Sequence, residues 1–345
     1  MNRKLTILDV AAKAGVSSGT VSHVINGTRD VSQARREQVL QAIRELGFVP
    51  NGLAQGLRRS RSRVVGLCVP DSASSYFAAL IDTVEDIAAD QGYEVMQVLS
   101  RHSSSVELGR VRALLSHRIA GLLIIPGLEP KQTFDLIADT GTPAVILDRI
   151  WNDNRFDYVT IDNRAAMREA VEALVRLDHT RLAYVVSYPG LVTTRQRIEA
   201  FHQTAQEASA AVSTKVLERG DNESAFAQRL TELLRSPAPP TAIIASNSVV
   251  TLWTMRILKS LGIQCPDEVS VLSFDEPDWA DVIEPSLSIV RQPTAEVART
   301  GWRLLMSRIV ERDAPTRHVE LTAKLILRGS VRPLSAGHLQ LNQIG

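Results

Sequence analysis

Five residues near the N-terminus have the types and spacing of a catalytic serine turn. Residues 15–19 read Gly-Val-Ser-Ser-Gly, which fits the Gly-x-Ser-x-Gly spacing of a hydrolase. In those enzymes a strand runs directly into the serine, and the tight turn that follows exposes its hydroxyl. Here the preceding residues are patterned as a helix, and no credible acid and histidine partners lie near them. The stretch therefore does not fit a nucleophile.

The same stretch fits the turn and second helix of a DNA-binding helix-turn-helix. Thr6 can cap a first helix over 7–14, and Gly15 can end it. Ser17 can cap a second helix over 18–26. That helix begins with short polar side chains that can approach base edges, and its first backbone amides attract phosphate.

A third helix is expected from a cap at Ser32 to Leu46, with Val39, Leu40 and Ile43 as its apolar stripe. Three short helices would also suit a protein-binding module, so the pattern alone leaves that alternative open.

Charge separates this head from the rest of the chain. Residues 1–63 carry eleven lysines and arginines against four acids, a net charge of +7. Because the whole chain carries +1, the remainder carries −6. A small basic head on a larger acidic body indicates a polyanion partner for the head.

From Val64 onwards, short apolar segments alternate with amphipathic segments of helix length. This alternation predicts parallel sheets covered by helices, and two such sheets joined by several crossings fit the length better than one. No apolar run approaches the roughly 20 residues that span a bilayer. Cys68 and Cys265 lie far apart without metal spacing, which favours buried thiols in a reducing cytoplasm.

The run "TILDVAAKAGVSSGTVSHVING", followed by Val-Ser and later by Leu-Gly-Phe-x-Pro-Asn, resembles the head of the lac repressor family of bacterial regulators. The resemblance extends more loosely to about Arg332 and implies a body like the periplasmic sugar-binding proteins. The fold class it implies is a small all-α helix-turn-helix head plus an α/β body of two parallel-sheet lobes. The expected domains are a DNA-binding head (1–50), a hinge helix (51–62), an effector-binding and dimerisation domain (63–333) and a tail (334–345).

The resemblance also implies which head residues contact DNA. Ser18, Gly19 and His23 stand where the family reads bases in the major groove. Relatives mostly carry Arg at the position of His23, so the operator is expected to differ from common family sites. The full expected DNA-binding set is Thr6, Ser17, Ser18, Gly19, Thr20, Ser22, His23, Asn26, Leu57 and Arg58.

Leu57 occupies the hinge position at which relatives wedge a leucine from each subunit into the minor groove. Arg58 is expected to contact phosphate, and the small polar residues of the second helix are expected to position the protein on the duplex.

In the body, eight residues near predicted strand ends match the effector site of ribose-binding relatives. Carboxylates accept from hydroxyls, guanidinium groups donate in a fork, amides do both, and aromatic rings can pack on a sugar. We expect a neutral monosaccharide or close derivative rather than a purine or sugar acid, although two arginines keep a carboxylated or phosphorylated ligand open. The eight residues are Tyr76, Phe77, Asp148, Arg149, Arg197, Asn247, Asp275 and Gln292.

Some positions beside this site depart from the family pattern and leave the pocket shape open. Ser248, Ser273 and Glu276 replace the usual Asp, Gly and Asp, and Trp253 replaces a usual Gly.

Two function classes follow. The first is a homodimeric regulator that binds palindromic double-stranded operator DNA under the control of a small molecule. We expect this regulator to be a repressor. The second is a sugar-processing enzyme with an accessory nucleic-acid-binding head. The body has no dinucleotide fingerprint, phosphate-binding loop or metalloprotease motif, so the regulator is favoured. We expect it to need no cofactor or metal and to have no membrane partner.

Overall fold

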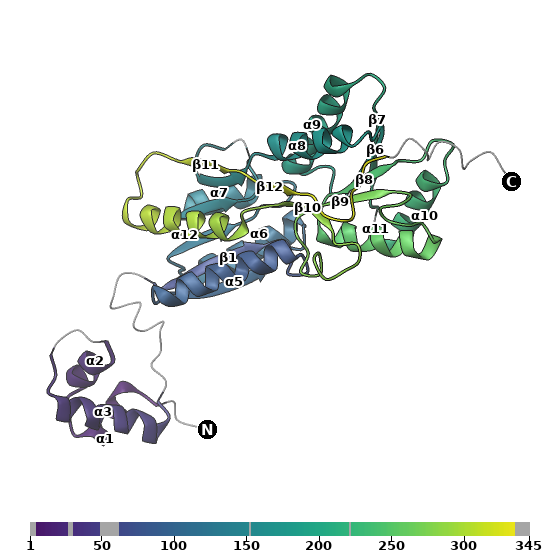
Figure 1. Ribbon diagram of the computed structural model, residues 1–345. Helices are drawn as coiled ribbons and strands as arrows, with labels where there is room; N and C mark the ends of the chain where they lie inside the picture. The colour runs from purple at the N-terminus through teal and green to yellow at the C-terminus, as the bar shows by residue number, and fades with distance from the viewer. Residues whose placement is uncertain (1–4, 27–29, 49–61, 152, 221, 335–345) are drawn as a thin grey trace. The chain divides into compact units, whose positions relative to one another are not determined.

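The computed structural model of the chain divides into two compact units, Met1–Ser62 and Arg63–Gly345. The predicted hinge falls almost entirely outside the described residues, which are 5–26, 30–48, 62–151, 153–220 and 222–334 (Figure 1).

Three short helices form the first unit, and their bounds agree with the sequence prediction. They are α1 (Ile7–Ala14), α2 (Ser18–Asn26) and α3 (Gln33–Leu46). Gly15 ends α1 with a φ of 65°, a left-handed conformation that glycine adopts without a steric penalty. Ser17 caps α2, because its Oγ accepts a hydrogen bond from the Thr20 backbone N at 3.1 Å.

The buried face of α3 differs from the predicted stripe at one position. Val39 and Ala42 are buried, and Ile43 and Leu46 pack beside them, so the helix contacts α1 and α2 through an i, i+3, i+4, i+7 row. Leu40 lies outside this row and is 38% exposed. Including Leu40 in the buried stripe was therefore wrong.

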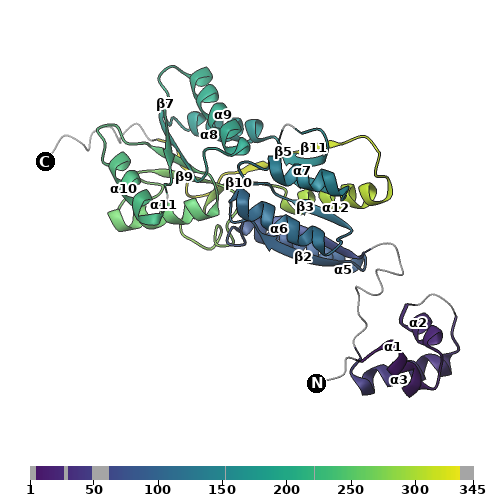
Figure 2. The ribbon, with the colours of Figure 1, turned by 180° about the vertical axis from the view of Figure 1, so that it is seen from behind.

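The second unit contains two six-stranded sheets, and its first lobe is built on the sheet β11-β5-β4-β3-β1-β2, in which every strand pair is parallel. Helices α5 and α12 pack on one face and α6 and α7 on the other (Figure 2). The elements are β1 (Val64–Val69), α5 (Ser75–Asp90), β2 (Glu94–Leu99), α6 (Ser104–Ser116), β3 (Gly121–Ile124), α7 (Lys131–Thr140), β4 (Ala144–Leu147), β5 (Asp157–Ile161), α12 (Thr294–Val310) and β11 (His318–Leu321).

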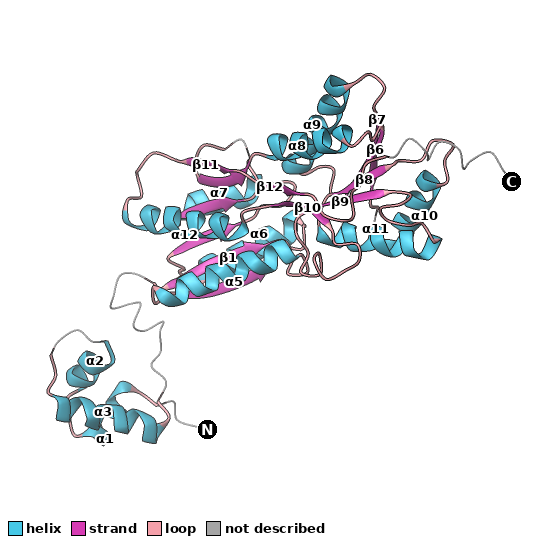
Figure 3. Ribbon diagram, viewed as in Figure 1, coloured by secondary structure: helices cyan, strands magenta, loops and turns pink. Residues whose placement is uncertain are grey.

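The second lobe repeats this design with the sheet β12-β10-β9-β8-β6-β7, in which only the β10–β12 pair is antiparallel. Helices α8 and α9 cover one face and α10 and α11 the other, so the strands lie between layers of helix (Figure 3). The elements are α8 (Asn163–Arg176), β6 (Arg181–Val186), α9 (Val192–Ala208), β7 (Ser213–Glu218), α10 (Glu223–Leu234), β8 (Ala242–Ala245), α11 (Ser248–Leu261), β9 (Ser270–Phe274), β10 (Ser288–Arg291) and β12 (Lys324–Ile326).

The chain crosses between the lobes three times, after β5, β10 and β11. Each crossing is short, since only one or two residues separate the elements on either side. The two lobes are thus joined by three short connecting segments. Such a connection allows the angle between the lobes to change.

In each sheet one strand lies where the order of connections reverses. This strand is β1, between β2 and β3, in the first lobe and β6, between β7 and β8, in the second. Ligands of open α/β sheets bind beyond the carboxyl ends of strands at such reversal points. The topology therefore predicts a site formed by the segments that follow β1 and β6.

Candidate functional site

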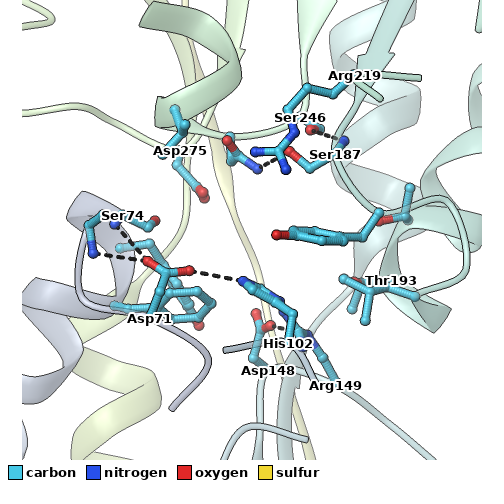
Figure 4. A pocket seen from close by; sticks show the side chains of 18 of the residues that line it. Asp71, Ser74, His102, Asp148, Arg149, Ser187, Thr193, Arg219, Ser246 and Asp275 are labelled. Atoms are coloured by element: carbon cyan, nitrogen blue, oxygen red, sulfur yellow. Dashed lines mark hydrogen bonds and ion pairs between the residues drawn. The ribbon is translucent and has the colours of Figure 1, made fainter. Parts of the chain in front are cut away.

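A cavity of about 340 Å³ lies at the carboxyl ends of strands from both lobes (Figure 4). All eight residues expected to bind an effector line it. The first lobe contributes Asp71, Ser74, Tyr76, Phe77, Arg101, His102, Asp148 and Arg149, and the second contributes Ser187, Tyr188, Thr193, Thr194, Arg197, Arg219, Ser246, Asn247 and Asp275, with Gln292 in a crossing.

Two aspartates follow strands directly and turn their carboxylates into the cavity. Asp148 follows β4 with φ 65°, and Asp275 follows β9 with φ 74°. Aspartate adopts this left-handed conformation more readily than most residues. The Asp148 carboxylate is 3.3 Å from the Arg149 guanidinium, which also donates to the Pro126 carbonyl at 2.6 Å. These contacts fix the orientation of Asp148 and Arg149 at the cavity wall.

Asp275 is the most strongly perturbed acid of the cavity. Burial raises its pKa to about 6, and the Arg197 charge and a hydrogen bond from Gln292 only partly offset that effect. The Gln292 amide donates to the carboxylate at 2.6 Å. A buried carboxylate of this kind gains most from a ligand that brings hydroxyl donors to it.

Arg197 is held in place by contacts on two sides. Its Nε donates to the Asn163 side-chain oxygen at 2.7 Å, and its guanidinium lies 3.5 Å from the centre of the Phe274 ring. Both contacts fix the plane of the donor group before a ligand arrives, which lowers the entropic cost of binding.

The remaining expected residues supply an amide and an apolar wall. Asn247 caps α11 by accepting from the Val250 backbone N at 3.0 Å, and its Nδ2 donates to Ser187 Oγ at 2.9 Å. Tyr76 and Phe77 are buried and meet edge to face with ring centres 5.3 Å apart. Together these residues form a cavity with convergent polar groups and one aromatic side.

Sequence reasoning missed a second group of lining residues. His102 Nε2 donates to the Asp71 carboxylate at 2.9 Å, and the His102 ring stacks on Tyr188 of the other lobe with ring centres 4.2 Å apart. The Arg219 guanidinium in turn lies 5.4 Å from the Tyr188 ring centre. Each of these residues closely follows β1, β2, β6 or β7, so the strand-end rule applied to every strand could have found them.

The head presents the predicted reading residues at the start of α2. Ser18 and Gly19 are exposed, whereas Thr20, Ser22 and His23 are half-buried. Thr6 donates from its N and Oγ1 to the Asp9 carboxylate at 2.7 and 2.6 Å, so it stabilises the beginning of α1. Asn26 is the last residue of α2, and the structure does not describe its side chain. The predicted DNA contacts Leu57 and Arg58 lie outside the described residues.

Comparison with known families agrees with both units. Residues 6–51 match the family described as bacterial regulatory proteins, lacI family, and residues 171–331 match the periplasmic binding protein-like domain. The chain therefore combines a lacI-family DNA-binding domain with a periplasmic-binding-protein-like domain.

The relatives that match this chain are transcriptional regulators, and each match covers nearly the whole length of the relative. The HTH-type transcriptional repressor PurR of Aliivibrio fischeri (strain MJ11) is 28% identical over 94% of this chain and 98% of that protein. The HTH-type transcriptional regulator KdgR of Bacillus subtilis (strain 168) is 28% identical over 94% and 97%. A solved complex of the transcriptional regulator CelR with cellobiose is 27% identical, with a TM-score of 0.69 over 95% of this chain and all of that one.

Each of these relatives is named as a transcriptional regulator or repressor, and none of them is named as an enzyme. No group of metal-ligating side chains occurs within the described ranges. None of the helices described combines the length and apolar character needed to cross a membrane.

Proposed function

We propose that this protein represses transcription by binding operator DNA, and that a small polyhydroxylated molecule in the cavity controls that binding. The effector class is a monosaccharide or a derivative of one. The observation that carries the proposal is the convergence of all eight effector candidates, chosen from the sequence, on one cavity between the lobes.

The chemistry of the cavity supports a polyol. Asp148 and Asp275 can each accept from ligand hydroxyls, and Arg149 and Arg197 can donate to ring or hydroxyl oxygens. The aromatic side can cover the apolar face of a sugar ring. The CelR complex with cellobiose, whose fold this chain shares, supports the same class.

DNA recognition is proposed to use α2 as the reading helix. Ser18, Gly19 and His23 would face base edges in the major groove, while the neighbouring hydroxyls and Arg58 would contact phosphates. A single helix of this kind reads only a few base pairs. We therefore propose a homodimer on a palindromic site, acting in the cytoplasm, where chromosomal DNA is found.

Control is proposed to pass through the angle between the lobes. Both lobes contact the ligand, so binding favours one lobe arrangement over the other by the difference in its affinity for the two. In the dimer that arrangement sets whether the hinge segments, with Leu57, can pair on the minor groove.

The proposal is tested by a thermal-shift screen followed by a binding selection on random duplex DNA. A pentose, hexose or acidic derivative is expected to raise the melting temperature, and the selection is expected to return a palindrome whose affinity changes with that compound. If only purines raise the melting temperature, the effector is a purine and the proposed sugar class is wrong. A purified dimer that selects no DNA sequence would overturn the repressor function.

A further inference from the structure

Arg219 is a cation in the cavity for which none of the described residues supplies an acidic partner. It follows β7 directly and lies against the rings of Tyr188 and Trp253, 5.4 and 4.9 Å from their centres. Its Nε is buried without a hydrogen-bond partner, and no carboxylate of the described chain lies within 4 Å of its guanidinium. Aromatic faces hold a guanidinium in position but leave its charge and its in-plane donors available to a ligand.

Two serine hydroxyls lie at the same end of the cavity as Arg219 (Figure 4). Ser187 Oγ accepts from Asn247 Nδ2 at 2.9 Å, and Ser246 Oγ accepts from the Ser187 backbone N at 3.3 Å. Each oxygen is thus engaged as an acceptor, while neither hydroxyl proton has an acceptor in the described parts of the chain. Both hydroxyls are set to donate. Ser246 and Asn247 also immediately precede α11, whose N-terminal end favours negative charge.

Each acid that lines the cavity already interacts with another group of the protein. Asp71 accepts from two backbone amides and pairs with His102, Asp148 pairs with Arg149, and Asp275 accepts from Gln292. Asp275 also interacts with the charge of Arg197, so each acid among the described lining residues has a cation other than Arg219 beside it. A partly buried cation with no acidic partner among the described residues costs free energy that an anionic ligand would recover.

We propose that Arg219, Ser187 and Ser246 form an anion subsite that binds the carboxylate or phosphate of an acidic sugar derivative. The inference rests on the proposed function and narrows it from sugars in general to charged ones. The planar edge of a guanidinium matches two oxygens of either group, and the two hydroxyls supply further donors. The uncharged part of the same ligand would then reach the Asp148 and Asp275 side of the cavity.

The test is calorimetric titration with matched ligand pairs that differ in one acidic group. The carboxylate arm compares glucose with glucuronate and galactose with galacturonate, and the phosphate arm compares glucose with glucose 6-phosphate and ribose with ribose 5-phosphate. At least one acidic member is expected to bind about tenfold more tightly than its neutral partner, the effect of one or two charge-assisted hydrogen bonds. Whichever arm shows the gain identifies the group.

Variants of Arg219 make the test specific. Arg219→Gln is expected to reduce the acidic preference to within about twofold while the neutral partner keeps its affinity, and Arg219→Lys is expected to keep part of the preference. Arg168→Gln removes an exposed arginine from α8, outside the cavity, and is expected to change neither affinity. A melting temperature for Arg219→Gln close to that of the parent excludes unfolding as the cause.

The outcomes separate the subsite from the proposed function. Neutral sugars that bind as tightly as their acids, or an acidic preference that survives in Arg219→Gln, would overturn the anion subsite and leave a sugar-controlled repressor. Failure of every sugar and every acid to bind would instead overturn the proposed effector class.

Discussion

Asp275 combines two properties that oppose each other in the unliganded protein, burial and a negative charge. Burial raises its pKa to about 6, above the ordinary value near 3.8, so between about pH 4 and pH 6 the folded state holds a proton that the unfolded state has lost. Stability from this group is therefore present at low pH and is lost as pH rises through 6. Asn is a good mimic of the protonated form and tolerates the same left-handed backbone.

Asp275→Asn is accordingly expected to raise the free energy of unfolding at pH 7.5 by roughly 1–3 kcal/mol, with a clearly smaller increase near pH 4.5. Urea unfolding at the two pH values measures this. A variant less stable than the parent at both would show that the charge contributes more through Arg197 than it costs by burial.

The affinity for the effector is expected to depend on the ionisation of Asp275 in the opposite sense to stability, so it should rise with pH where stability falls. Ligand hydroxyls donate to the ionised carboxylate, so the affinity of the unmodified protein should increase as pH rises from 5 to 7. Titration of the identified effector at several pH values checks this, and Asp275→Asn serves as the control that should bind weakly with no such trend. A parent affinity that is flat over the range would remove Asp275 from direct ligand contact.

His23 is the residue with which the proposed reading of bases by α2 can be tested. If the imidazole touches a base edge, His23→Ala should relax the preference at one position in each half-site at a cost of ~1–3 kcal/mol. Arg58→Ala is the matched comparison, because loss of a phosphate contact should weaken all sequences about equally. Selection on random duplexes with both variants measures the difference, and an unchanged base preference in His23→Ala would exclude it from the reading set.

Among the elements, β5, α12 and the start of β11 depend on one buried acid. The Asp157 carboxylate accepts from Arg308 Nε and Nη2 at 3.1 and 3.0 Å and from the Arg317 backbone N at 2.7 Å. The acid is fully buried and Arg308 nearly so, which makes this pair sensitive to the loss of either partner.

Asp157→Ala is expected to destabilise the body by about 3–5 kcal/mol, because it leaves the Arg308 guanidinium buried without a counter-charge. Asp135→Ala is the control, since Asp135 is exposed and its pairs with Lys131 and Arg155 should contribute no more than about 1 kcal/mol. Denaturant unfolding of the two variants distinguishes them. Equal losses would mean that the buried network does not hold these elements together.

For the whole molecule, the effector and the operator are expected to be coupled through the lobe angle. Arg197→Ala removes a cavity donor and should abolish the response to effector, while ligand-free operator affinity stays within about twofold of the parent. Operator titration with and without effector measures both quantities. A variant that responds fully would place the effector elsewhere, whereas one that loses operator binding without ligand would show that Arg197 acts on the fold of the body.

The sequence by itself determined those features that depend on near neighbours. The three helices of the head have the predicted bounds, since these depend on residues only three or four positions apart. The predicted cap at Ser32 was wrong in one respect, because Ser32 precedes α3 but its side chain makes no capping hydrogen bond. The eight cavity residues could be chosen because the family resemblance and the strand-end rule both depend on the order of elements along the chain.

Tertiary structure alone decided which groups meet and which remain unpaired. Leu40 has the right residue type for the core but lies off the face that α1 and α2 cover. Asp157 and Arg308 are 151 residues apart in the chain, and His102 meets Tyr188 only because two lobes close on one cavity. The same holds for Arg219, which has no acid partner among the residues that the structure describes. Burial and pairing are set by distant segments that fold together, and no local pattern records them.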